Sequence, residues 1–350
     1  MSKKKGVLLV NLGSPDSPNV GDVRRYLREF LMDERVLDIP WISRFFLVHF
    51  LILPSRPKKS AKAYREVWLP EGSPLVVTSK NVCAQLQTRV DVPVELAMRY
   101  QNPSVKQGID HLLDHGVDEI LLIPLFPHYA MSSYETAVEK TRTVLHRRAS
   151  GVNLIVQPPF FDHPDYIRAL VANAREALDQ GYDHLLFSFH GLPERQLRKS
   201  DPSGNHCLTA NDCCTGSHPS HNTCYRAQCF KTVNAFVRDA GIPPEKHSVA
   251  FQSRLGRDPW LQPYTDLELP RLARQGVRRM LVICPAFVSD CLETVEEIGM
   301  RAKETFTEAG GESLELVPCM NEHPLWIKAL ENMVTAFLAP DPPPVESAHD

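Results

Sequence analysis

Residues 116–123 read GVDEILLI, and the same pattern returns 160 residues later as GVRRMLVI at residues 276–283. Each copy is a short apolar run preceded by a glycine turn, which is typical of a buried β-strand. A second pair with the same spacing, DHPDYIRAL at 162–170 and EHPLWIKAL at 322–330, predicts in each case a helix that begins at a proline. Two matches at one spacing indicate an internal duplication.

Further apolar runs alternate with helical patterns throughout the chain, and this alternation predicts parallel sheets covered by helices. The sequence therefore predicts an α/β fold with two similar Rossmann-like domains, each a four-stranded parallel sheet flanked by helices. We assign residues 1–161 and 162–338 to these domains, with the active-site cleft between them, and expect residues 339–350 to form a disordered tail. The predicted strands are residues 7–10, 92–98, 119–125 and 153–157 in the first half, and 185–189 and 248–252 with the repeat copy at 276–283 in the second.

The composition is that of a globular protein, with 43% hydrophobic and 23% charged residues in 350. The net charge of -3 argues against nucleic acid as a partner. Because the first apolar run is too short for a secretory signal and no stretch is long enough to span a bilayer, we expect a cytoplasmic protein. Residues 39–54, IPWISRFFLVHFLILP, have two interpretations: a buried helix, or an exposed apolar lip that contacts a greasy ligand or gives peripheral membrane association.

Residues 185–195, LLFSFHGLPER, form a predicted strand that ends at His190. Ligands bind at the carboxyl ends of parallel strands, and histidine can carry a proton or a metal ion near neutral pH. A second segment, residues 285–293, resembles a strand end that turns into a helix, with Ser289 or Asp290 as its cap. Glu293 and Glu297 would share one face of that helix. The simple alternatives are a structural histidine and carboxylates that complement a helix dipole.

Two common ligand-binding signatures are missing from the sequence. Gly13-Ser14-Pro15 follows the first strand but matches neither a dinucleotide fingerprint nor a phosphate-binding loop. The chain also lacks a Gly-x-Ser-x-Gly nucleophile elbow. Dehydrogenase, kinase and α/β-hydrolase functions are therefore disfavoured, and a histidine–carboxylate site for protons or Fe²⁺ is the better interpretation.

The sequence resembles the ferrochelatase family over roughly residues 5–338. The motifs that carry the resemblance are VNLGSPDSP, YREVWLPEGSPL, SFHGLPER, FQSRLGRDPWLQPYT and CPAFVSDCLETVEEI. The resemblance implies insertion of Fe²⁺ into protoporphyrin IX, with release of two protons, in the last step of haem synthesis. It also implies that His190 and Glu293 are catalytic and contact the metal, and that Glu297 is the next carboxylate of the site.

The same resemblance implies that the porphyrin contacts Leu12, Arg99, Tyr100 and Trp260. An apolar residue at position 12 favours a protoporphyrin enzyme, because some coproporphyrin-metallating relatives have tyrosine there. In animal members a histidine stands two residues before the catalytic glutamate, and here that residue is Cys291. The alternatives are a coproporphyrin-type ferrochelatase and a non-catalytic tetrapyrrole or haem carrier.

A cysteine-rich insert, residues 205–224, has no counterpart in ordinary bacterial members of the family. It contains Cys207, Cys213, Cys214 and Cys224, four thiols in a loop rich in glycine, serine, asparagine and histidine. In a reducing compartment such a set is not a disulfide framework. Four thiolates suit a [2Fe–2S] cluster, as in certain bacterial ferrochelatases, or a zinc ion, and free thiols are the third alternative. The oligomeric state is not predicted.

Overall fold

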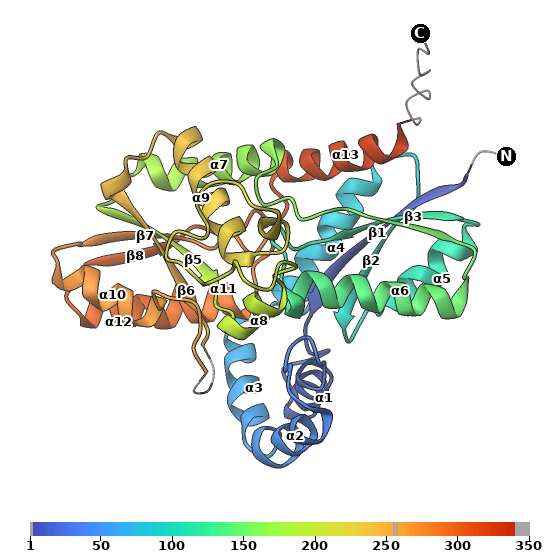
Figure 1. The fold of residues 1–350 in the computed structure, drawn as a ribbon, viewed down its shortest axis with the longest axis horizontal. Helices are drawn as coiled ribbons and strands as arrows, with labels where there is room; N and C mark the ends of the chain where they lie inside the picture. Colours follow the sequence, from blue (N-terminus) through green and yellow to red (C-terminus); the bar gives the residue numbers. More distant parts are fainter. Residues whose placement is uncertain (1–2, 255, 257, 340–350) are drawn as a thin grey trace, which may run out of the picture.

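The computed structural model describes residues 3–254, 256 and 258–339, and it contains two four-stranded parallel sheets (Figure 1). The strand order is β2-β1-β3-β4 in the first sheet and β6-β5-β7-β8 in the second, so the second half repeats the first. The predicted fold class and duplication are confirmed. The strands are β1 (Lys5–Gly13), β2 (Val94–Tyr100), β3 (Glu119–Pro124), β4 (Asn153–Val156), β5 (His184–His190), β6 (His247–Gln252), β7 (Arg279–Ile283) and β8 (Ser313–Leu316).

Helices cover both faces of each sheet, as expected for parallel strands. In the first half they are α1 (Val20–Leu31), α2 (Trp41–Phe46), the π-helix η1 (Leu47–Ile52), α3 (Arg56–Val67), α4 (Pro74–Gln87), α5 (Val105–Asp114), the π-helix η2 (Met131–Glu135) and α6 (Thr136–Arg148). In the second half they are α7 (Pro164–Asp179), α8 (Glu194–Lys199), the 3₁₀ turn η3 (Pro219–Asn222), α9 (Tyr225–Ala240), the 3₁₀ turn η4 (Pro244–Lys246), α10 (Thr265–Arg274), α11 (Leu292–Thr294), the π-helix η5 (Val295–Ala302), α12 (Lys303–Glu308) and α13 (Pro324–Leu338).

The two helices predicted to begin at Pro164 and Pro324 are present as α7 and α13, and they pack against each other. Helix α13 also packs on α4 of the first half (Figure 1). Arg89 pairs with Glu331 at 3.3 Å, and the Lys5 ammonium donates to the carbonyl of Phe337 at 2.7 Å. The last helix therefore packs in the second half and also contacts the first. Residues 340–350, most of the predicted tail, lie outside the described residues.

Helices α1, α2, η1 and α3 project from the body of the molecule (Figure 1). Val23 of α1 packs against Ala61 and Tyr64 of α3, and these contacts hold the projection together. Its tip is residues 39–54, where five large apolar side chains are more than half exposed: Trp41, Ile42, Phe46, Phe50 and Leu51. The geometry is that of an exposed lip and not of a buried helix. In the part of the chain that the structure describes, no helix is long and apolar enough to cross a bilayer.

Candidate active site

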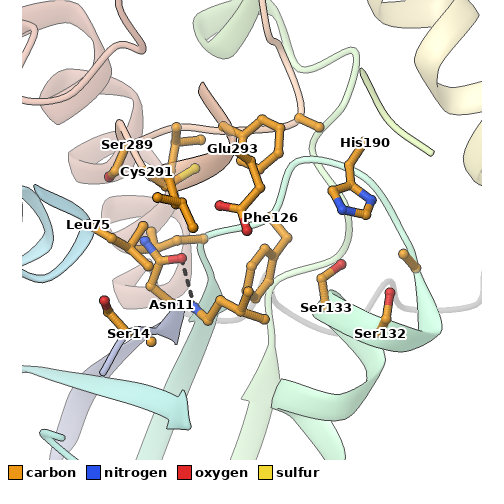
Figure 2. A pocket seen from close by; sticks show the side chains of 18 of the residues that line it. Asn11, Ser14, Leu75, Phe126, Ser132, Ser133, His190, Ser289, Cys291 and Glu293 are labelled. Atoms are coloured by element: carbon orange, nitrogen blue, oxygen red, sulfur yellow. Dashed lines mark hydrogen bonds between the residues drawn. The ribbon is translucent and has the colours of Figure 1, made fainter. Parts of the chain in front are cut away.

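A cavity of ≈ 990 Å³, its open mouth included, lies between the carboxyl ends of β1 and β3 and those of β5 and β7 (Figure 2). Its size is at the upper end of the roughly 300–1,000 Å³ that small-molecule sites occupy. The wall is mostly apolar, with Leu12 and Phe126 from the first half and Phe287 from the second. A large cavity with a mostly apolar wall suits an apolar small molecule.

His190 ends β5 and enters the cavity from one wall (Figure 2). Its Nδ1 lies 2.7 Å from the carbonyl oxygen of Gly191. A carbonyl only accepts hydrogen bonds, so Nδ1 carries the proton and the neutral imidazole keeps its lone pair on Nε2. The contact therefore selects the tautomer that can accept a proton at Nε2.

The turn after His190 requires a glycine. A Cβ atom at Gly191 would lie 2.8 Å from the carbonyl oxygen of Gln252 and 3.3 Å from the ring of Trp260. Gln252 also accepts a hydrogen bond from Ser188, at 2.7 Å, and donates one to the carbonyl of Glu293, at 2.9 Å. This buried amide thus ties the histidine strand to the glutamate segment. Trp260 packs behind the turn. Among the described residues, it is not one of those that line the cavity.

Glu293 lines the cavity together with Cys291 (Figure 2). The N-cap of the helical segment is Cys291 and not Ser289 or Asp290: its backbone N–H donates to Thr294 Oγ1 at 3.0 Å. Asp290 instead accepts a hydrogen bond from the backbone N–H of Cys319, which holds the preceding turn. Burial, and then the Glu293 carboxylate, raise the pKa of the Cys291 thiol. That thiol is therefore protonated beside the carboxylate.

The predicted α-helix around Glu297 is a π-helix, η5, after the single turn α11. π-Helical turns are frequent at functional sites. Glu297 accepts a hydrogen bond from Ser253 Oγ at 2.6 Å and lines a second, polar cavity of ≈ 710 Å³ that adjoins Arg254 and Arg301. Burial raises the pKa of Glu297, while Ser253, His190 and Arg301 act in the opposite direction. The carboxylate therefore interacts electrostatically with His190 although it faces a different cavity.

Leu12 lines the cavity at the end of β1, as the sequence predicts, but Arg99 and Tyr100 lie elsewhere. Arg99 pairs with Asp33, and the hydroxyl of Tyr100 donates to the same carboxylate at 2.9 Å. Both side chains therefore hold the connection between α1 and α2. The ring of Tyr100 lies 5.2 Å from that of Phe30, which does line the cavity, so Tyr100 stands behind the wall.

Several lining residues are absent from the sequence prediction because they come from helices and not from strand ends. Tyr26 and Phe30 of α1 and Tyr64 of α3 form one wall, and Ser133 of η2 and Tyr225 of α9 contribute to others. The apolar stripe of α1 is visible in the sequence, but such a stripe normally indicates a core-facing side. No pattern in the sequence distinguishes an apolar stripe that faces a cavity from one that faces the core.

The four cysteines of the insert converge in space. Cys207, Cys214 and Cys224 belong to one cluster, and Cys213 Sγ lies 3.9 Å from Cys214 Sγ. A hydrogen bond from the Cys214 thiol lowers the pKa of Cys224 to about 6. Cys229 is buried in the main core instead. Within the described residues, no group of three or more histidine, cysteine, aspartate or glutamate side chains is arranged to hold a metal ion.

Comparison with known proteins identifies the family. The sequence model of the ferrochelatase family matches residues 4–338. The chain belongs to the ferrochelatase family. It is 53% identical to the ferrochelatase of Ectopseudomonas mendocina over 327 residues, 93% of this chain and 96% of that one. It is 52% identical to the ferrochelatase of Opitutus terrae over 337 residues, 95% of this chain and 98% of that one.

Solved structures with the same fold include SirB from Bacillus subtilis with Fe³⁺, at a TM-score of 0.54 and 13% identity, covering 96% of both chains. A second SirB structure, a sirohydrochlorin chelatase in complex with cobalt, has a TM-score of 0.53 and 12% identity, covering 95% of this chain and 94% of that one. At such identities the likeness shows the chelatase fold alone. Ferrochelatases are metal chelatases of haem synthesis that use Fe²⁺ and a porphyrin, and this chain is an enzyme of that kind.

Proposed function

We propose that this ferrochelatase inserts Fe²⁺ into protoporphyrin IX to form protohaem, with His190, Glu293 and Glu297 as its reactive groups. The observation that carries the proposal is the fixed tautomer of His190 at the wall of an apolar cavity that also exposes Glu293. Leu12 supports protoporphyrin over a more carboxylated ring, because it places an apolar side chain where the ring would lie.

The reaction exchanges two pyrrole N–H protons for one Fe²⁺ ion. His190 Nε2 is the base that takes a proton from the ring, and it returns that proton to water before the second transfer. Glu293 faces the same cavity and contacts the incoming Fe²⁺, and Glu297 passes protons or iron from the polar cavity behind it. Apolar walls around the ring exclude water, which strengthens each of these charge interactions.

The test compares protoporphyrin IX with coproporphyrin III under anaerobic conditions with Fe²⁺. Haem formation is followed by the loss of porphyrin fluorescence and the change in the visible spectrum. We expect the ratio kcat/KM to be at least tenfold higher for protoporphyrin. A preference for coproporphyrin contradicts the assigned substrate, and binding of either porphyrin without metallation contradicts the catalytic role and favours a carrier.

We also propose that Cys207, Cys213, Cys214 and Cys224 hold a [2Fe–2S] cluster. Support comes from the convergence of four thiols in one loop, because sulfur ligands of this number and softness suit an iron–sulfur cluster. The cluster would be structural or regulatory, since porphyrin metallation transfers no electrons. Anaerobically purified protein is expected to be coloured, with about two iron and two sulfide per chain. A colourless protein with one zinc contradicts the proposal, and Cys83→Ser serves as the control variant outside the insert.

We further propose that the protein works in the cytoplasm with its lip, residues 39–54, in peripheral contact with an anionic membrane. The exposed apolar tip is followed by the exposed basic residues Arg56, Lys58 and Lys59 on α3. Sedimentation with phosphatidylglycerol vesicles tests the contact. Phe50→Ser should weaken binding severalfold, whereas Leu267→Ser, which removes another apolar residue that is more than half exposed, should not. Equal effects of the two variants contradict the proposal.

A further inference from the structure

Helix α9 stands between the cysteine insert and the substrate cavity. Cys224, the last cysteine of the insert, is the N-cap of the helix, and Tyr225, the first helical residue, lines the cavity. The first turn of α9 therefore touches both sites. A displacement of the insert must therefore move this turn, unless the residues of the insert itself rearrange to compensate.

Gln228, one turn into α9, connects the insert to the cavity wall through a single side chain. It is fully buried. Its Nε2 donates to the carbonyls of His221, at 3.1 Å, and Asn222, at 3.0 Å, both in the last turn of the insert. Its Oε1 accepts a hydrogen bond of 2.7 Å from the backbone N–H of Tyr129, in the loop after β3. In such a buried position, the loss of one partner leaves a donor or acceptor unsatisfied, which is costly.

On the side of the insert, the connection continues to the cysteines. His221 is buried, and its Nε2 donates to the carbonyl oxygen of Cys213 at 2.8 Å. The backbone of one of the four converging cysteines is therefore joined to Gln228 by two successive hydrogen bonds, through the side chain and then the carbonyl of His221.

On the side of the cavity, the connection ends at His128, the residue before Tyr129 and part of the cavity wall. Its Nε2 lies 2.8 Å from Thr232 Oγ1, also on α9. Thr232 donates its own proton to the carbonyl of Phe161 at 2.6 Å, so His128 is the donor in the first contact. Burial lowers the pKa of His128 to about 3, which keeps the ring neutral. Helix α9 thus sets both the place and the tautomer of this wall residue.

We propose that Gln228 is a positioning residue that couples the order of the cysteine insert to the shape of the porphyrin cavity. The thiol site then controls porphyrin affinity without taking part in the chemistry. The inference rests on the proposed function because it assumes that the cavity binds a porphyrin. It does not depend on which group, if any, the four thiols hold. Close-packed interiors transmit such a shift, because the wall has little free space in which to relax.

A double-mutant cycle on the full-length protein tests the coupling, with protoporphyrin affinity and kcat as readouts. Gln228→Glu keeps the acceptor for Tyr129 but has no donor for the insert, and Cys213→Ser disturbs the insert itself. We expect each change to weaken porphyrin binding about tenfold, the equivalent of about 1.4 kcal/mol, with kcat within about twofold. The double variant should be no weaker than either single one, because both cut the same connection.

The matched control is Gln196→Glu. Gln196 is also buried and donates to two main-chain carbonyls, those of Arg35 and Val36, but these belong to the connection before the lip. The effect of Gln196→Glu on porphyrin affinity should add to that of Cys213→Ser. Additive effects of Gln228→Glu and Cys213→Ser, or a fall in kcat with unchanged affinity, would overturn the proposal.

Hydrogen exchange gives a second measurement that needs no change at Gln228 and no porphyrin. In the Cys213→Ser protein, the protection factor of the Tyr129 amide should fall at least tenfold, whereas the protection factors of the β3 amides should not change. Unchanged protection at Tyr129 would overturn the coupling. If the wild-type protein binds no porphyrin, the proposed function fails, and the exchange result still decides the coupling.

Discussion

At the scale of single residues, the environment of Glu297 opposes its charge. Burial raises its pKa from the ordinary 4.5, so the folded protein binds this proton more tightly than the unfolded chain. A raised pKa contributes stability below pH 4.5, and this contribution is lost as the pH rises through the folded value. At neutral pH the ionised carboxylate is therefore a cost to folding, which is typical of groups retained for function.

We predict that Glu297→Gln lowers activity yet stabilises the fold at neutral pH by about 1 kcal/mol. The gain should vanish below about pH 4.5. Thermal unfolding at several pH values checks it. Glu296→Gln is the matched control: Glu296 accepts two hydrogen bonds from Arg301, at 2.8 and 2.9 Å, so its replacement should destabilise. A destabilised Glu297→Gln protein at neutral pH contradicts the prediction.

Residues that the sequence places at strand ends line the cavity in some cases and lie away from it in others. His190 and Leu12 line the cavity because the end of a parallel strand is a ligand-binding position in any such fold. Arg99 also ends a strand, but its partner Asp33 lies on the connection between α1 and α2, which no local pattern indicates. The side chain therefore turns away from the cavity that the strand end predicts.

At the scale of elements, the cysteine insert is organised by one carboxylate, Asp201, which stands just before it. One oxygen accepts hydrogen bonds from Ser220 Oγ and Ser203 Oγ, at 2.6 and 2.7 Å. The other accepts from the backbone N–H groups of His206 and Cys207, both at 2.8 Å. These hydrogen bonds hold the pKa of Asp201 far below its ordinary value against the opposing effect of burial. The carboxylate thus gathers both ends of the insert.

We predict that Asp201→Asn destabilises the protein by about 3 kcal/mol, because an amide nitrogen would meet N–H donors where an oxygen accepted them. A lowered pKa contributes stability above the ordinary 3.8 that is lost as the pH falls, so variant and wild type should converge in acid. Thermal unfolding and limited proteolysis of residues 201–224 check this. Asp212→Asn, an exposed aspartate in the insert, should be neutral, and equal sensitivity of the two variants would refute the role.

Two elements show why local patterns leave alternatives open. The apolar stretch 39–54 fits a buried helix and an exposed lip equally well. Only the tertiary structure decides whether other residues pack over Phe46 and Phe50. The segment after Glu293 has α-helical spacing, yet it forms the π-helix η5, in which Glu297 accepts a hydrogen bond from Ser253, the residue after β6. Packing overrides periodicity in both cases.

At the scale of the whole molecule, one hydrophobic core spans both halves. It includes Leu9 of β1, Phe187 of β5 and Trp326 of α13, all fully buried. The ring of Trp326 lies 5.7 Å from Phe160 of the first half and 6.5 Å from Tyr166 of α7. The duplication predicts two sheets, but it does not predict this shared core, because the crossing of α13 is a matter of packing.

We predict a single cooperative unfolding transition, with equal calorimetric and van't Hoff enthalpies. Trp326→Ala should lower the free energy of unfolding by about 3–5 kcal/mol and leave one transition, since the cavity it creates lies in the shared core. Differential scanning calorimetry checks both statements. Two resolved transitions would mean that the halves unfold as separate domains.

In the proposed reaction, His190 removes the ring protons during iron insertion. The most direct test is the anaerobic metallation rate of protoporphyrin IX by His190→Ala protein, with porphyrin affinity measured in parallel and the exposed His146→Ala variant as the control. Loss of a general base should lower kcat by about 10²–10⁴-fold. We expect this loss with porphyrin affinity within about twofold of wild type. Full activity of the His190→Ala protein would refute the role of His190 as the base.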